Sequence, residues 1–261
     1  QQFSGNGDVI ALGLDAPQAL NALADEALAP ADRQVGPTIT AMLDAREEGG
    51  FVVQDLGIPA GLRWSLEESF ALAESLDALA RSDRSEHRGG EDFEDPLSVR
   101  PARGAHLLPV AIMGRDAAQG RLLMPARDDE DEADAQEPGC LAVDWPAARQ
   151  DPEVQRRHDW LARRLQGQGA RLLANPLWRL LPAEMEFMLG DQRGPMITVH
   201  PLGGCAMADD AARGVVNEWG QVFSGRAGDQ VHPGLAVLDG AILPTALGIN
   251  PALTITALAL R

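Results

Sequence analysis

One histidine in a glycine-rich turn is the residue of this sequence whose surroundings best suit proton chemistry. His200 opens the run HPLGGC at residues 200–205. An imidazole titrates near neutral pH, so it can accept or donate a proton at a reacting hydroxyl group. Pro201 stiffens the backbone beside it, and we expect Gly203 and Gly204 to permit the close approach of a flat ring. Taken alone, the pattern favours a histidine packed within a turn, so the rest of the sequence decides its role.

A second polar residue, Asn250, stands directly before an apolar segment near the end of the chain. Residues 251–261 read PALTITALALR, which is too short to span a membrane and predicts a buried helix. Asparagine is a good N-cap residue, and Pro251 suits the first helical position. A helix start of this kind favours negative charge. The amide of Asn250 can also donate to a substrate oxygen without titrating, and both uses can hold together.

The residues before this helix predict a strand and a turn. Residues 235–238 read LAVL and have the length of a short strand, which Asp239 and Gly240 end. A loop that contains Pro244 and Gly248 then leads to Asn250. On their own, Asp239 and Gly240 form an ordinary Asp-Gly turn.

These two stretches resemble the C-terminal signature of the glucose–methanol–choline (GMC) family of FAD-dependent alcohol oxidoreductases. The motifs are HPLGGC at residues 200–205 and a tail over 239–259 that reads DG…P…GINP…TITALA. Three further stretches are similar to the cholesterol-oxidase-like branch: SGNGD at 4–8, FVVQDLGIP at 51–59 and NPLW at 175–178. An asparagine at position 250, where many relatives have a second histidine, also favours this branch.

The resemblance implies oxidation of a bulky, apolar, sterol-like alcohol by hydride transfer to N5 of FAD. It implies that His200 faces the flavin and the substrate hydroxyl as a base or hydrogen-bond partner, and that Asn250 orients the substrate oxygen. The implied cofactor-binding residues are Asp239, Gly240, Asn250, Pro251 and Ala252. The first two would lie at the ribityl chain or pyrophosphate, and the helix start would stabilise the negative charge of the reduced ring.

The glycine-rich motif of a dinucleotide-binding fold is missing from this sequence. That fold opens with a strand, GxGxxG and a helix. Gly5 and Gly7 provide the first two glycines, but Ile10 occupies the third place and a strand is predicted to follow. The chain therefore resembles only the C-terminal half of a GMC protein. Its expected partner is the missing N-terminal FAD-binding half, in the same gene or as a second chain.

The predicted elements make the fold class α+β. Strands are predicted over 9–14, 38–43, 50–55, 106–113, 121–124 and 140–145, with a hairpin around 46–50. Pro109 suggests an edge or a bulge in its strand. A capping box at Ser65 and Glu68 predicts a helix to about residue 80 that buries Phe70, Ala73, Leu76 and Ala80.

A second helix is predicted from Asp151 to Arg164, with Val154, Trp160, Leu161 and Leu165 available for its buried side. We expect two domains. A mostly antiparallel substrate-binding domain with helices spans 1–205 and carries the histidine motif. Residues 206–261 form the closing strand–loop–helix of an FAD-binding α/β domain.

Two neighbouring residues, Gln54 and Asp55, are candidates for an acidic position of the site. The resemblance implies an acidic residue near the stretch at 51–59. One register places Gln54 there, which is no base, and a slip of one residue places Asp55 there. Strand alternation sends these two side chains to opposite faces, so only one of them can point inward.

The net charge and the cysteines exclude several other functions. A formal net charge of −17 disfavours nucleic acid or an anionic membrane as partner. Residues His200, Cys205 and His232 match no zinc spacing, so no metal site is expected. No stretch of the sequence reaches the length of a transmembrane segment, so we expect a soluble protein. The sequence does not indicate its cellular compartment. Gln1 is not expected to be the native start. The alternative function is a non-catalytic remnant that binds an apolar ligand or partner chain without FAD.

Overall fold

The chain divides into two compact units, each assembled from segments that are distant in the sequence. The computed structural model describes residues 2–20, 22, 39–59, 61–62, 65, 68–69, 71–72, 75, 106–124, 141–175, 177–179, 194 and 196–261. Unit 1 comprises Gln1–Asp8, Met113–Ala148 and Thr198–Arg261, and unit 2 comprises Val9–Ile112 and Arg149–Ile197. This division differs from the single boundary expected after Cys205, because residues 1–8 and 113–148 group with the C-terminal segment.

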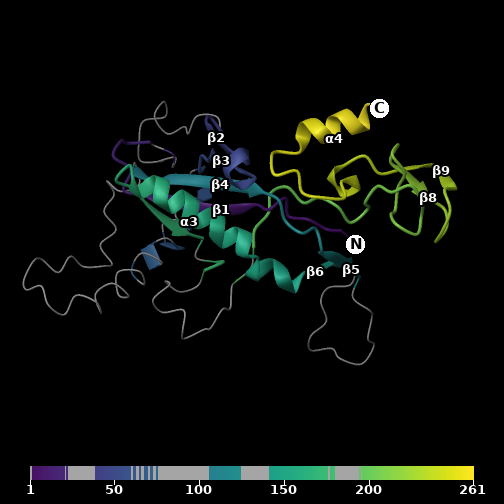
Figure 1. Cartoon of the computed structure of the whole chain (residues 1–261), viewed down its shortest axis with the longest axis horizontal. Coiled ribbons are helices and arrows are strands. Elements are labelled where there is room, and N and C mark those ends of the chain that lie inside the picture. The colour runs from purple at the N-terminus through teal and green to yellow at the C-terminus, as the bar shows by residue number, and fades with distance from the viewer. Residues whose placement is uncertain are drawn as a thin grey trace, which may run out of the picture. The chain divides into compact units, whose positions relative to one another are not determined.

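Unit 2 is organised around a five-stranded sheet (Figure 1). The strands of this sheet are β1 (Val9–Leu14), β2 (Met42–Ala45), β3 (Phe51–Asp55), β4 (Leu108–Gly114) and β7 (Arg171–Ala174), in the order β2-β3-β4-β1-β7. The last two residues of β4 already belong to unit 1. β1 pairs antiparallel with both β4 and β7, and β2 pairs antiparallel with β3. The strand predicted at 9–14 and the hairpin around 46–50 are confirmed, with the short helix α1 (Arg46–Gly49) forming the turn.

The predicted edge position of the strand that contains Pro109 is wrong. β4 lies between β3 and β1, in the interior of the sheet. Pro109 is the second residue of β4, close to the start of the strand, where proline is better tolerated than in its middle. Its carbonyl still accepts a hydrogen bond from the Leu56 N–H at 2.9 Å.

The helix α3 (Pro152–Gln166) packs its apolar side against this sheet and confirms the second predicted helix. Asp151 is its N-cap and accepts from the Glu153 N–H at 2.9 Å. Val154 and Leu161 belong to the same buried cluster as Val9, Phe51 and Ile112.

The buried side of α3 also contains two polar residues that the sequence analysis missed. Arg157 and His158 are buried, and the His158 ring stacks on Trp178 with centroids 5.0 Å apart. Burial lowers the pKa of His158, which favours its neutral form.

The first predicted helix starts earlier than its capping box suggested. Gly61, Leu62 and Ser65 are already helical, and the Ser65 hydroxyl donates to the Leu62 carbonyl oxygen at 3.1 Å. Ser65 is therefore an interior residue of the helix and not its N-cap. The predicted buried face lies outside the described residues (Phe70, Ala73, Leu76 and Ala80).

The described part of unit 1 consists of short elements. Its elements are β5 (Arg121–Leu123), β6 (Ala142–Asp144), β8 (Gln221–Phe223), β9 (Val231–Ala236), the 3₁₀ helix η4 (Gly240–Ile242) and the helix α4 (Ala252–Ala259). A further 3₁₀ helix, η2 (Pro146–Gln150), lies where the chain passes from unit 1 to unit 2. β5 pairs with β6 and β8 with β9, both antiparallel. Helices and antiparallel sheets together make the fold α+β, as expected.

Two predictions for the C-terminal segment are wrong. The strand expected at 235–238 ends at Ala236 and begins at Val231, because Gln221 and Phe223 of β8 pair with that earlier register. The helix expected to be buried is exposed, with Leu253 and Leu260 86% and 82% accessible to solvent. Its apolar sequence predicted burial, yet no described residue of this chain covers those two side chains. None of the described helices combines the length and the hydrophobicity needed to cross a membrane.

Candidate functional site

The HPLGGC turn and the residues after Asp239 lie side by side and are joined by backbone hydrogen bonds. The N–H groups of Gly203, Cys205 and Met207 donate to the carbonyl oxygens of Gly240, Ala241 and Ile242 at 3.0, 3.0 and 2.9 Å. On the other side of the turn, Leu202 exchanges two backbone hydrogen bonds with Ser4, at 2.8 and 2.9 Å. Three stretches that are distant in the sequence thus form one scaffold around His200.

Gly203 makes room for the backbone of Gln2, whereas the sequence motif suggested that it makes room for a flat ring. Its φ is +75°, and a Cβ built on it would lie 1.8 Å from the carbonyl oxygen of Gln2. The close approach expected of a flat ring is therefore made by the backbone of Gln2. Glycine is required here because a side chain would collide with the N-terminal segment.

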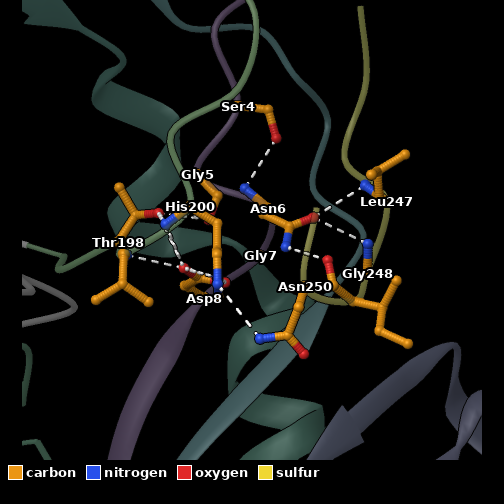
Figure 2. A network of polar contacts seen from close by, with 12 residues as sticks. Ser4, Gly5, Asn6, Gly7, Asp8, Thr198, His200, Leu247, Gly248 and Asn250 are labelled. Carbon is orange, nitrogen blue, oxygen red and sulfur yellow. Dashed lines mark hydrogen bonds and ion pairs between the residues drawn. The ribbon is translucent and has the colours of Figure 1, made fainter. Parts of the chain in front are cut away.

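Asn6 fixes the loop that leads to Asn250. Its side chain is fully buried, and its Oδ1 accepts from the N–H groups of Leu247 and Gly248, both at 2.9 Å (Figure 2). Its Nδ2 donates to the carbonyl oxygen of Ile249 at 2.9 Å. The φ of Asn6 is +56°, a left-handed conformation that asparagine adopts more readily than most residues. The amide therefore satisfies three backbone groups of one loop from a single position.

Asp8 holds the turn that begins the histidine motif. Its side chain is 4% exposed. Its Oδ2 accepts from the Thr198 hydroxyl at 3.0 Å and from the N–H groups of Val199 and His200 at 2.9 and 3.1 Å. The same oxygen lies 3.0 Å from Nδ1 of His200.

Asp8 is not among the residues predicted from the sequence. There, SGNGD at 4–8 is only a stretch similar to the family. The available signal was an aspartate in a polar run directly before a buried strand, a place where a carboxylate needs partners.

The structure brings His200 and Asn250 together. Nδ2 of Asn250 lies 3.4 Å from Nε2 of His200, on the edge of the ring opposite Asp8 (Figure 2). That distance is long for a hydrogen bond, so the contact is a loose one. The His200 side chain is 18% exposed, which leaves part of the ring open to solvent. A hydroxyl oxygen placed near this edge could contact both nitrogens.

The charge of Asp8 is set by opposing effects. Burial raises the pKa of Asp8, whereas the hydrogen bond from Val199 and the nearby His200 ring act to lower it. An isolated carboxylate buried to this degree would favour its neutral form. The donors of residues 198–200 are what make a buried anion tolerable beside the imidazole.

The expected capping role of Asn250 is wrong by one residue. α4 begins at Ala252, and its N-cap is Pro251, whose ring has no atom that can accept a capping bond. The first intrahelical bond runs from the Ile255 N–H to the Pro251 carbonyl at 2.9 Å. The Asn250 side chain instead lies at the His200 ring.

Asp239 and Gly240 have local structural roles. The Asp239 side chain is exposed and accepts from the Ala241 N–H at 2.9 Å, which caps η4. Gly240 is buried against the histidine turn, where an added Cβ would lie 3.0 Å from the Pro201 carbonyl oxygen. These two residues thereby anchor the turn that carries His200.

The two candidates for an acidic side chain, Gln54 and Asp55, both lie in unit 2. Gln54 is 5% exposed, and its Nε2 lies 3.6 Å from Sδ of Met42. Burial acts to raise the pKa of Asp55, but hydrogen bonds from Thr40 and Ala41 at 2.6 Å outweigh it and lower that pKa. A carboxylate held in this way is a weak base.

The first turn of α4, which follows Asn250 closely, offers backbone donors of the kind that the polar edge of a flavin ring would need. The N–H groups of Ala252, Leu253 and Thr254 precede the first intrahelical bond of α4, so they are the orphan donors of its first turn. Leu253 in that turn is 86% exposed. Among the described residues, no group of three histidine, cysteine or acidic side chains is close enough to hold a metal ion.

Comparisons with known proteins point to one family for this part of the chain. Residues 134–259 match the C-terminal-domain model of the GMC oxidoreductases. Over 64 residues the chain is 47% identical to a cholesterol oxidase from Acinetobacter baumannii, which is 24% of this chain and 10% of that protein. It is 32% identical over 93 residues to a cholesterol oxidase from Mycobacterium tuberculosis, 34% of this chain and 15% of that protein.

A third relative has another substrate in its name. The chain is 44% identical over 62 residues to a paromamine 6'-oxidase from Streptomyces fradiae, 24% of this chain and 10% of that protein. The matched segments thus span 10–15% of the length of these relatives. The stretch that holds His200 and Asn250 is therefore similar to the C-terminal domain of GMC oxidoreductases.

Proposed function

We propose that this chain is the catalytic C-terminal part of an FAD-dependent alcohol oxidoreductase. The observation that carries the proposal is the meeting of His200 and Asn250, whose nitrogens lie 3.4 Å apart at a partly open ring edge. The two residues come from separate motifs, and both motifs lie within the GMC-like segment 134–259.

In the proposed reaction, Nε2 of His200 accepts the proton of the substrate hydroxyl. The Asn250 amide donates to the same oxygen and keeps it at the ring edge. FAD, when bound, accepts the hydride that leaves the carbinol carbon. The alcohol thereby loses one proton and one hydride and becomes a carbonyl compound, and the proton stays on the imidazole until solvent removes it.

The residues proposed to hold FAD are Asn250, Pro251 and Ala252 at the ring, with Asp239 and Gly240 near the ribityl chain or pyrophosphate. Support for the first group comes from the backbone donors at the start of α4, which favour negative charge. The Asp239 side chain already accepts from Ala241, so its part is to keep the turn in place.

The proposed partner is a glycine-rich FAD-binding half, in the same gene or as a second chain. The exposed apolar helix α4 supports this, because Leu253 and Leu260 are 86% and 82% accessible in the chain by itself. Apolar side chains exposed together on one helix are typical of a surface that another domain covers. In this proposal residues 206–261 complete the FAD-binding domain and unit 2 contributes to the substrate-binding domain.

The proposed substrate is a bulky, apolar secondary alcohol of sterol type. Two of the matched relatives are cholesterol oxidases, and a third is named for paromamine. The shared segment therefore supports the proposed alcohol oxidation more directly than it supports a sterol as the substrate.

The test is turnover by the native protein with cholesterol and with paromamine, followed through carbonyl product in the presence of O₂ or an artificial electron acceptor. We expect a yellow, flavin-containing protein that oxidises cholesterol. His200→Ala should lose about 10²-fold or more of kcat while FAD stays bound. His232→Ala, which changes an exposed histidine of β9, is the matched control and should retain activity.

The alternative is a non-catalytic remnant that binds an apolar ligand or partner chain without FAD. Its support is the missing third glycine at Ile10. A native protein that stays colourless after FAD is added, and that oxidises neither alcohol, would establish this alternative and reject the enzyme.

A further inference from the structure

The Asp8–His200 contact lets the proton positions of the site be assigned. An ionised carboxylate only accepts hydrogen bonds. The oxygens of Asp8 lie 3.0 and 3.3 Å from Nδ1 of His200, and Oδ2 already accepts from three other donors. Nδ1 must therefore carry the ring proton when Asp8 is charged. In a neutral imidazole, Nε2 is then left with its lone pair.

The opposite edge of the ring agrees with this assignment. Nε2 lies 3.4 Å from Nδ2 of Asn250, an amide nitrogen that can only donate. A proton on Nε2 would place two donors against each other. The donors and acceptors from Asp8 through His200 to Asn250 are thus mutually consistent only when Nδ1 carries the ring proton.

We propose that Asp8 is a positioning residue that holds His200 as the Nδ1–H tautomer, so that Nε2 can accept the substrate proton. Asp8 touches no reacting atom in this account and acts through the imidazole. When Nε2 takes up a proton the ring becomes cationic, and the adjacent carboxylate stabilises that charge. This last step rests on the proposed function, whereas the tautomer assignment does not.

The neighbouring charged groups do not share this role. Asp116, in the loop after β4, accepts from the Ser4 hydroxyl and the Gly7 N–H, both at 2.9 Å. Arg115 precedes it in the same loop. Asp116 therefore supports the N-terminal segment that contains Asp8, but it accepts from that segment and from the Ala118 N–H rather than from the His200 ring. It is the matched control for any effect of Asp8 on folding.

The direct test is nitrogen NMR of the native protein labelled with ¹⁵N-histidine. The signal of His200 is assigned by its loss in His200→Ala among the 5 histidines of the chain. We expect the spectrum of the neutral His200 ring to show a protonated Nδ1 and an unprotonated Nε2. A protonated Nε2 with a bare Nδ1 would overturn the proposal without any activity measurement.

Asp8→Asn tests the cause of the tautomer. The amide oxygen can keep the donors of residues 198–200 from the Oδ2 position, and the NH₂ group then takes the Oδ1 position, 3.3 Å from Nδ1, where it opposes a proton on that nitrogen. We expect the tautomer to shift to Nε2–H and kcat to fall by about 10²-fold or more. Asp116→Asn should leave the tautomer unchanged, even if it lowers Tm.

Two outcomes separate this proposal from the proposed function. If Asp8→Asn leaves the Nδ1–H tautomer in place, Asp8 has no positioning role. If the native protein shows Nδ1–H, and Asp8→Asn shifts it, but no alcohol is oxidised, the tautomer assignment stands and the proposed function fails.

Discussion

At the scale of single residues, the site depends on a carboxylate buried where charge is costly. Asp8 is 4% exposed, and its burial raises its pKa. The backbone N–H groups of Val199 and His200 and the Thr198 hydroxyl offset that cost by donating to Oδ2. An aspartate with so many partners is placed to hold the imidazole, because its geometry is fixed before any substrate arrives.

The raised pKa of Asp8 predicts a pH dependence of stability. Its favourable contribution is complete below its usual pKa of 3.8 and is lost as the pH rises through the higher pKa of the folded state. The stability of the native protein relative to Asp8→Asn should therefore decrease over this window. Tm measured by circular dichroism from about pH 3 to pH 7 checks this.

Asp44 provides a control with the opposite sign. Hydrogen bonds from Arg46 lower the pKa of Asp44 to about 2. The contribution of Asp44 to stability is complete above its usual pKa of 3.8 and is lost as the pH falls through about 2.

For Asp8, the contradicting result is a stability advantage of the native protein over Asp8→Asn that grows as the pH rises.

Asn250 should matter for turnover more than for folding. A lost N-cap costs about 1 kcal/mol, but the N-cap of α4 is Pro251. Asn250→Ala should therefore lower the free energy of unfolding by less than about 0.5 kcal/mol. Because the amide is proposed to donate to the substrate oxygen, kcat should fall by about 10²-fold.

Urea denaturation and steady-state turnover of the same samples check both parts. Asn217→Ala serves as control, since its side chain caps a turn through Trp219 and Gln221. A large loss of stability with unchanged kcat in Asn250→Ala would show a structural residue instead.

His200 and Asn250 could be proposed from the sequence, whereas the pairing of Asp8 with His200 could not. The two former residues stand in long motifs with unusual neighbours. Asp8 acts on a residue 192 positions away, and that pairing depends on the tertiary fold. The capping role of Asn250 was misjudged because proline can occupy the N-cap as well as the first helical position, and the sequence does not separate the two.

At the scale of elements, three short stretches meet to position the pair. Residues 4–8 contact the histidine turn through Ser4 and Asp8 and the asparagine loop through Asn6. The turn also runs beside η4, with Gly203 bonded to Gly240. Each side of the His200–Asn250 pair is thus held by the same N-terminal segment.

The contact at Gly203 predicts a strong effect of a single methyl group. Its φ is +75°, and an added Cβ would meet the Gln2 carbonyl oxygen at 1.8 Å. Gly203→Ala should cost about 2–5 kcal/mol of stability, from the left-handed backbone and from overpacking together. Thermal and urea denaturation measure this loss.

Gly228 is the matched control for this substitution. It has a φ of +85°, but nothing lies within 4 Å of a Cβ built there. Gly228→Ala should show only the backbone cost of about 1–2 kcal/mol. Equal losses for both variants would show that the close approach of Gln2 is unimportant.

Local sequence patterns predicted where strands and helices occur better than they predicted strand pairing and helix burial. β1 and the hairpin of β2 and β3 follow from apolar runs and a glycine-containing turn, and α3 follows from its Asp-Pro start. The interior place of β4 depends on which strands pair with it, and Pro109 alone suggested the opposite. The burial of α4 depends on what lies beside it, which composition does not specify.

At the scale of the whole molecule, the two compact units are assembled from segments that alternate along the chain. Unit 1 contains every residue of the Asp8, His200 and Asn250 network. Leu253 in its helix α4 and Leu260 directly after that helix are exposed, at the end of a segment that matches a GMC C-terminal domain. These features fit the proposal that the His200–Asn250 pair is complete in this chain, while the proposed cofactor site needs the proposed FAD-binding half.

The most direct measurement of the central claim is the rate of flavin reduction by cholesterol without oxygen, observed by stopped-flow absorbance. The account predicts that the visible flavin absorbance of the native protein disappears on mixing. In His200→Ala it should disappear about 10²-fold or more slowly, with the same flavin content at the start. Equal rates in the two proteins would contradict the claim that His200 accepts the substrate proton.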